Sequence, residues 1–155
     1  MRICCDIDGV LADVRKYIKL FLPHDWSTYL SYTLAFPCIE PMGCLIRDLV
    51  DNEQNDVYFV TGRPESNREP TVVWLRLYVI AEGVDVHLLM RPDHDPRSNC
   101  DVKMDWFRSL KPDLIIDDDP KVAEVAVQEG FVVLQPHGFR ATENDMIPFN
   151  KEVTK

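Results

Sequence analysis

The chain has 155 residues, of which 46% are hydrophobic and 28% are charged, and its formal net charge is −9. This length suits one domain with one core over residues 1–155, and the hydrophobic fraction is too high for an intrinsically disordered chain. The acidic balance argues against a broad binding surface for nucleic-acid backbones, while it allows a local basic pocket or a site that binds cations.

The cysteines and the N-terminal residues bear on the compartment of the protein. The number of cysteines is five, and none has the CxxC spacing typical of zinc sites, so we expect neither a zinc site nor a disulfide framework. Asp6 and Asp8 interrupt the N-terminal apolar stretch, which argues against a signal peptide. No apolar run approaches the roughly 20 residues that span a bilayer. We therefore expect a soluble, cytoplasmic protein with no membrane partner.

Short apolar runs alternate with helical patterns along the chain. The runs predict strands at 3–7, 56–60, 86–90, 113–116 and 131–134. The patterns between them predict helices at 42–52, at 71–82, from an N-cap at Asp101 to Leu110, and from Pro120 to Gly130. Continuous apolar runs this short are typical of buried parallel strands. The alternation predicts an α/β fold, with a central parallel sheet of about five strands, helices on both faces and right-handed crossovers.

Residues 17–41 break the alternation. They are rich in aromatic residues and are predicted to form a small, mainly helical insert after the first strand. A packed mini-core is the favoured interpretation of these rings, and a platform for stacking single-stranded bases is the alternative. The residues from about 141 to 155 are predicted to be an irregular tail.

Polar residues follow three of the predicted strands at the point where each strand ends. In sheets of this type, ligands bind beyond the carboxyl ends of the strands, so we expect these side chains to converge. They are Asp6, Asp8 and Gly9; Thr61, Gly62 and Arg63; Asp117, Asp118 and Asp119; and Lys103, which begins the helix before the fourth strand.

A convergence of carboxylates needs a positive charge to offset their repulsion. Asp6, Asp8, Asp117 and Asp118 offer oxygen ligands without a nearby histidine or thiolate, which favours magnesium over zinc. Lys103 is predicted in the first turn of its helix, where a cation opposes the helix dipole. Such an unfavourable position indicates a functional role.

The same residues suit phosphoryl transfer. Asp6 and Asp8 are two positions apart and point to the same side of an extended chain. One of them can attack phosphorus as a nucleophile, and the other can protonate the leaving oxygen and later activate water. Thr61 offers a hydroxyl and a backbone N–H group to a phosphate oxygen, and Arg63 offers a planar guanidinium.

Four segments in order resemble the motifs of the haloacid dehalogenase (HAD) superfamily of phosphatases. Asp6-Ile7-Asp8-Gly9-Val10-Leu11 resembles the first motif, Thr61-Gly62-Arg63 the second, Lys103 the third and Ile116-Asp117-Asp118 the fourth. The motifs span roughly residues 2 to 134, and the resemblance implies a HAD-like Rossmannoid three-layer fold.

This resemblance implies a role for each matching residue. Asp6 matches the nucleophile, which is also a metal ligand, and Asp8 matches the acid and base. Thr61 and Lys103 match phosphate-binding residues.

The resemblance also implies Mg²⁺ as the cofactor. It is held by Asp6, by the backbone carbonyl of Asp8 and by Asp118, with Asp117 either as a ligand or as the partner of one.

A narrower resemblance is to the 3′-phosphatase domain of phage polynucleotide kinase–phosphatases. It rests on residues 61–65, on Thr71 and Trp74, on residues 89–92 and on Arg97 ahead of Val102-Lys103. It implies that Arg63, with either Arg91 or Arg97, binds the substrate phosphate. Where those domains carry an acidic residue four positions before the lysine, this chain has Asn99.

The expected activity is the removal of 3′-phosphates from nucleic-acid ends. The alternatives are a phosphatase for nucleoside monophosphates or other small phosphomonoesters, and a non-enzymatic phospho-acceptor of the receiver type. Receivers place their phospho-acceptor after the third strand and their lysine after the fifth. Here only Asp93 and Asp95 follow the third predicted strand as possible acceptors, and Lys103 precedes the fourth.

Overall fold

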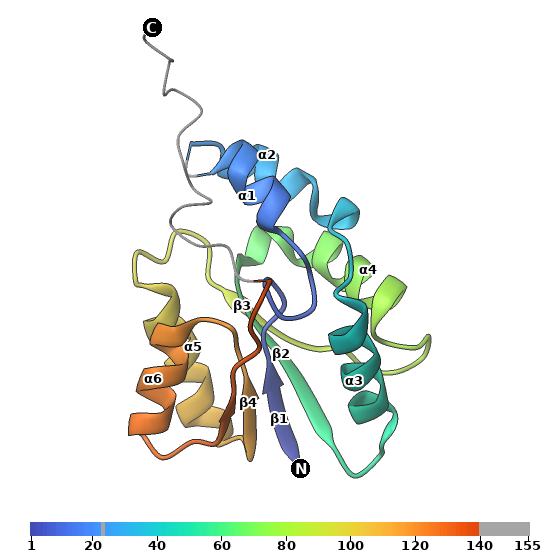
Figure 1. Ribbon diagram of the computed structural model, residues 1–155, viewed down its shortest axis with the longest axis vertical. Helices are drawn as coiled ribbons and strands as arrows, with labels where there is room; N and C mark the ends of the chain where they lie inside the picture. The colour runs from blue at the N-terminus through green and yellow to red at the C-terminus, as the bar shows by residue number, and fades with distance from the viewer. Residues whose placement is uncertain (23, 140–155) are drawn as a thin grey trace, which may run out of the picture.

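The structure, a computed structural model, describes residues 1–22 and 24–139 (Figure 1). Its centre is a five-stranded sheet in the order β3-β2-β1-β4-β5, and every neighbouring pair is parallel. The strands are β1 (Arg2–Cys5), β2 (Asp56–Pro64), β3 (His87–Arg91), β4 (Leu114–Ile116) and β5 (Val133–Leu134). The predicted parallel α/β sheet is therefore confirmed.

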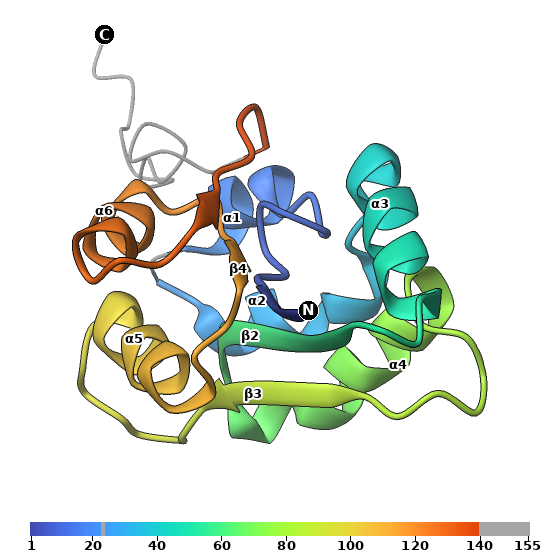
Figure 2. The same ribbon diagram turned by 90° about the horizontal axis from the view of Figure 1, so that it is seen from below.

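Helices cover both faces of the sheet, as predicted. Figure 2 shows α3 (Glu40–Asp51) and α4 (Arg68–Tyr78) on one face, and α5 (Asn99–Leu110) and α6 (Pro120–Gln128) on the other. Successive residues of a strand point to opposite faces, so the short apolar strands supply two cores. One core joins Ile3, Cys5, Phe59, Ile46 and Trp74, and the other joins Cys4, Val60, Ile115, Phe107 and Val122.

Strand β2 is longer than predicted. It continues past Val60 to Pro64, because its pairing with β3 resumes after a register shift between Thr61 and Pro64. The segment Thr61-Gly62-Arg63 therefore lies within an irregular strand end instead of following the strand. Sequence alone gives no sign of this extension, because pairing after a bulge depends on the neighbouring strand.

Two helices begin earlier than predicted, and each includes a proline in its first turn. Pro41 is the second residue of α3, and Pro70 is the third residue of α4. The first N–H groups of a helix have no partner within the helix, so proline is tolerated there. Helix α4 also ends at Tyr78, four residues before the predicted end at Glu82.

The start of α5 corrects two expectations. Ser98 is the N-cap, and its side chain accepts the hydrogen bond from the backbone N–H of Asp101, which was predicted to be the cap. Lys103 is the fifth residue of this helix, one turn further in than predicted. Its position therefore does not oppose the helix dipole, whose effect falls off within the first turn. Asp119 is the N-cap of α6, and its side chain accepts a hydrogen bond from the backbone N–H of Lys121.

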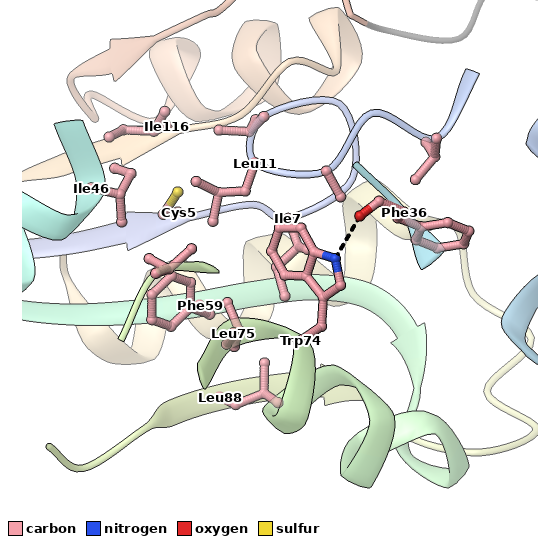
Figure 3. Packing of buried hydrophobic residues seen from close by; sticks show 14 of the residues in the cluster. Cys5, Ile7, Leu11, Phe36, Ile46, Phe59, Trp74, Leu75, Leu88 and Ile116 are labelled. Atoms are coloured by element: carbon pink, nitrogen blue, oxygen red, sulfur yellow. Dashed lines mark hydrogen bonds between the residues drawn. The ribbon is translucent and has the colours of Figure 1, made fainter. Parts of the chain in front are cut away.

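The insert lies beyond the carboxyl ends of the strands (Figure 1). It consists of α1 (Arg15–Phe21), α2 (Trp26–Ser31) and a 3₁₀ turn (Thr33–Ala35), so it begins slightly earlier than predicted. Its rings form a chain of contacts, and the indole N–H of Trp74 donates to the carbonyl of Phe36 at 2.8 Å (Figure 3).

No helix among the described residues is both long enough and apolar enough to cross a membrane. The predicted tail lies outside the described residues.

Candidate active site

A tight turn after β1 brings the first motif against the last. The N–H of Asp6 donates to the carbonyl of Ile116 at the end of β4, at 2.9 Å. Gly9 has φ +84, and a Cβ atom there would lie 2.7 Å from Cγ of Asp118. Glycine at this position therefore serves two purposes: it adopts the left-handed backbone conformation, and it admits the Asp118 carboxylate.

Gly9→Ala is expected to lower the free energy of unfolding by more than about 2 kcal/mol, because backbone strain adds to a steric clash. Gly83→Ala is the matched control. Gly83 has nearly the same φ, +86, and no atom lies within 4 Å of the point that a Cβ atom would occupy, so only the strain of about 1 kcal/mol is expected. Denaturant unfolding of both variants measures the difference, and equal losses would show that Asp118 does not depend on Gly9.

Three buried carboxylates and one buried lysine form the centre of the site. Oxygen atoms of Asp6, Asp117 and Asp118 lie within 4.8 Å of one another. Lys103 is 1% exposed, and its Nζ lies 2.7 Å from Oδ2 of Asp6 and 2.7 Å from Oδ2 of Asp117. The remaining oxygen of Asp117 accepts a hydrogen bond from the N–H of Asp119 at 3.0 Å. The strand ends and α5 thus converge as the sequence predicts.

The pKa shifts in this cluster indicate an excess of negative charge. Burial raises the pKa of Asp6 well above its ordinary value, and Asp117 and Asp118 raise it further, while Lys103 opposes them. Burial disfavours the ammonium form of Lys103, but Asp117 and Asp6 outweigh it and raise the pKa, so Lys103 stays protonated. When all three carboxylates are ionised, they and the one ammonium group leave an excess of two negative charges, and this excess is what raises the pKa of Asp6 beyond the effect of burial.

A divalent cation would balance this excess. The donors are hard carboxylate oxygens, and no cysteine or histidine belongs to the group of three residues. This donor set fits Mg²⁺ better than zinc. Asp6, Asp117 and Asp118 are therefore the residues that could hold the ion. The side chain of Asp8 is not part of this group and turns to another partner.

That partner is Arg63, which the sequence suggested as a phosphate-binding residue. Its Nε donates to one oxygen of Asp8 at 3.0 Å and its Nη2 to the other at 2.5 Å. Its Nη1 donates to the hydroxyl of Thr71 at 3.2 Å, and the guanidinium carbon lies 5.4 Å from the ring centroid of Phe36. Arg63 is 3% exposed and lines the pocket, and these contacts direct its guanidinium group to Asp8. The geometry makes it a holder of the Asp8 carboxyl group.

Of the two arginines that the sequence left as alternatives, Arg91 lines the pocket. Its Nε donates to the carbonyl of Gly62 at 3.3 Å, and its Nη2 lies 3.5 Å from Oδ1 of Asn99. A Cβ atom at Gly62 would lie 2.8 Å from Cγ of Asn99, so this glycine allows the close approach of Asn99. Thr61 is buried beside them, and its hydroxyl accepts from the N–H of Arg63.

Arg97 is not among the described residues that line the pocket. Its guanidinium forms ion pairs with Asp95 and Asp105 on the surface, while its carbonyl accepts a hydrogen bond from Arg91 at 2.7 Å. In this structure local carboxylates hold the Arg97 side chain, so Arg91 is the better placed of the two alternatives.

The pocket has a volume of about 600 Å³ and two chemically different walls. The polar wall contains Asp6, Asp8, Thr61, Gly62, Arg63, Arg91, Asn99, Asp118 and Asp119. The apolar wall comes mainly from the insert and contains Val14, Ile18, Leu22, Trp26, Tyr29 and Leu30. The spacing of its members, four residues apart along α1 and three or four in α2, was a signal of a shared helix face. The predicted mini-core concerned only the aromatic rings of the insert and not its aliphatic residues.

No protein-family model matches the chain, and no curated protein sequence matches it. Solved structures do. The chain is similar to a chain in "Structure of Pnkp1/Rnl/Hen1 complex", with a TM-score of 0.67 and 20% identity over 87% of this chain and 45% of that one. A chain of the Pnkp1/Rnl/Hen1 RNA repair complex gives the same TM-score and identity, with 42% of its length covered.

The class C acid phosphatase from Bacillus anthracis, solved with tungstate bound, is also similar. Its TM-score is 0.61 at 13% identity, over 98% of this chain and 74% of that one. At these identities the likeness concerns the fold, which is HAD-like, as predicted. The chain spans less than half the length of the chains that it matches in the Pnkp1/Rnl/Hen1 structures.

Proposed function

We propose that this chain, which has the fold of HAD-type phosphatases, is a Mg²⁺-dependent phosphomonoesterase that removes 3′-phosphates from nucleic-acid ends. The observation that carries the proposal is the buried group of Asp6, Asp117, Asp118 and Lys103, of which Asp6 and Asp118 line the pocket, together with the carboxyl group of Asp8, which Arg63 holds in the same pocket. One carboxylate is required to attack phosphorus and another to move a proton.

In the first half of the reaction, an oxygen of Asp6 attacks phosphorus and the ester P–O bond breaks. The carboxyl group of Asp8 gives its proton to the departing oxygen, and Asp6 carries the phosphoryl group. Lys103, 2.7 Å from Asp6, donates hydrogen bonds to the phosphoryl oxygens. The hydroxyl of Thr61 offers a further contact.

In the second half, the Asp8 carboxylate takes a proton from water as the water oxygen bonds to phosphorus. The bond between phosphorus and Asp6 breaks, and inorganic phosphate leaves. When bound, Mg²⁺ supplies the positive charge that offsets repulsion between the carboxylates and the phosphate.

The substrate class is supported by two observations. One of the similar structures is named an RNA repair complex. Within this chain, Arg91 lines the pocket and provides a local cation on an otherwise acidic protein. A protein with a net charge of −9 suits recognition of an end, which needs few phosphate contacts, better than binding along a polymer.

The test is phosphate release from matched oligonucleotides that carry a 3′- or a 5′-phosphate, and from a nucleoside monophosphate, with and without Mg²⁺. We expect rapid Mg²⁺-dependent release from the 3′ end alone. A preference for the nucleoside monophosphate would change the proposed substrate from a polymer end to small phosphomonoesters, and the proposed catalytic residues would stay the same. No release from any substrate would refute the phosphatase proposal and return the chain to the phospho-acceptor alternative.

Arg63→Lys is expected to lower kcat on 3′-phosphorylated oligonucleotides about 100-fold, because lysine cannot hold both oxygens of Asp8 and proton transfer becomes inefficient. The loss on p-nitrophenyl phosphate should be much smaller, since its leaving group needs no proton. Arg108→Lys, at an exposed surface ion pair, is the matched control. Equal losses on the two substrates would show that Arg63 does not act through Asp8.

A further inference from the structure

The apolar wall of the pocket faces the catalytic carboxylates but carries no charge of its own. It comes from α1, α2 and Val14, and it belongs to the same continuous space as Asp6 and Asp8. Burial raises the pKa of the Tyr29 phenol, so this ring stays neutral. The arginines among the described lining residues, Arg63 and Arg91, come from β2 and β3 and not from the insert.

Trp26 is the exposed member of this wall. It is 57% exposed, whereas Tyr29 beneath it is 3% exposed. The two rings meet edge to face, with centroids 5.8 Å apart and planes at 83°. The contact packs the indole against Tyr29 and leaves much of the indole exposed to solvent. A large ring with this exposure inside a ligand pocket offers a flat face to a bound molecule.

Buried contacts anchor the insert to the rest of the fold. The Trp74 indole donates to the Phe36 carbonyl (Figure 3), and the hydroxyl of Thr33 donates to Oδ1 of Asn67 at 3.0 Å. Thr33 and Asn67 are both buried. The apolar wall is therefore a fixed part of the pocket, and a ligand that binds there does not have to order it first.

A molecule that fills this pocket has a phosphate at one end and a flat, uncharged, largely apolar group at the other. A nucleotide has this composition, and a volume of about 600 Å³ is within the range of sites for small ligands. We propose that the base of the phosphate-bearing nucleotide unstacks from the neighbouring base and stacks on Trp26 in the apolar wall. This inference rests on the proposed function.

Because the protein is acidic, stacking of the base on Trp26 is the main source of its affinity for the nucleic-acid end. At −9, the surface gains little from backbone phosphates, and stacking supplies binding energy that salt barely affects. The base must be unstacked to reach the wall, so single-stranded ends are substrates and blunt duplex ends are poor ones. Every base has a π face, so the identity of the base matters little.

The test compares KM for a 3′-phosphorylated single strand with KM for the same strand carrying an abasic terminal nucleotide. In the wild type, we expect the abasic strand to have a KM about tenfold higher. Trp26→Ala should raise KM about tenfold for the normal strand and remove the difference between the two strands. Trp26→Phe should keep most of the preference, whereas Trp26→Leu, apolar but not planar, should behave like Trp26→Ala. Leu34→Ala, an exposed position of the insert outside the pocket lining, is the control.

A binding measurement separates this inference from the proposed activity. In an Asp6→Asn background, the normal strand should quench tryptophan fluorescence more than the abasic strand does, and Trp26→Phe should remove the extra quenching. Turnover with equal KM for both strands and for Trp26→Ala would overturn the stacking proposal and leave the phosphatase intact. Trp26-dependent quenching by a protein that releases no phosphate from any substrate would support the base site and sink the proposed activity.

Discussion

Asp6→Asn is expected to reduce phosphate release by about 10⁴-fold or more, because the amide lacks the charge and the lone-pair basicity of the attacking carboxylate. The variant should still fold. Asn at this position removes one of three crowded carboxylates, and Lys103 keeps its contact with Asp117 at 2.7 Å. Steady-state kinetics measures the first expectation, and thermal unfolding without Mg²⁺ measures the second.

Trapping the phosphoenzyme would identify the residue that carries the phosphoryl group. Acid-quenched wild-type enzyme should gain one phosphoryl group on the peptide that contains Asp6, detected by mass spectrometry, and Asp6→Asn should gain none. Asp85→Asn, at an exposed aspartate away from the pocket, is the control and should behave as the wild type. Substantial turnover by Asp6→Asn, or phosphate on another residue, would refute the nucleophile.

The convergence of the candidate catalytic residues could be predicted from the sequence, because these residues follow a topological rule. Asp6, Lys103 and Asp117 are far apart along the chain, yet two of them end neighbouring parallel strands and the third lies on the helix that precedes β4. Strand ends meet at one edge of a parallel sheet whatever the intervening residues are. The short apolar runs that located the strands were therefore enough to bring these residues together.

The partner of Asp8 was not accessible in this way. Arg63 was expected to face the phosphate, because an arginine near a strand end suits an anion. Whether it points at the ligand or at a neighbouring carboxylate depends on the bulge in β2 and on the packing of Phe36 and Thr71 around the guanidinium. These are contacts between distant parts of the chain that no local pattern encodes.

The sequence could not show which ring of the insert is open to a ligand, for a related reason. Trp26 and Tyr29 are both aromatic residues of one short helix, and composition cannot tell which ring is covered. In the structure one is 57% exposed and the other 3% exposed. The difference follows from the position of α2 over the strand ends, which is set by the anchoring of the insert on α4 and not by α2 itself.

Lys103→Met is expected to lower the free energy of unfolding by about 3–5 kcal/mol in the absence of Mg²⁺. The ammonium group is buried between Asp6 and Asp117, and its removal leaves their charges without a partner in a dry environment. Lys121→Met, at an exposed position of α6, should change stability by less than about 0.5 kcal/mol. Denaturant unfolding of both variants gives the comparison.

A second substitution separates lost charge from lost packing. Lys103→Met combined with Asp117→Asn removes one positive and one negative group, so the net charge of the cluster returns to its wild-type value. The asparagine Oδ1 can still accept the hydrogen bond from the N–H of Asp119. This double variant should recover at least half of the stability lost by Lys103→Met alone, and saturating Mg²⁺ should stabilise the single variant more than the wild type. If neither change recovers stability, the loss in Lys103→Met does not come from unbalanced charge, and the fit of the methionine side chain accounts for it.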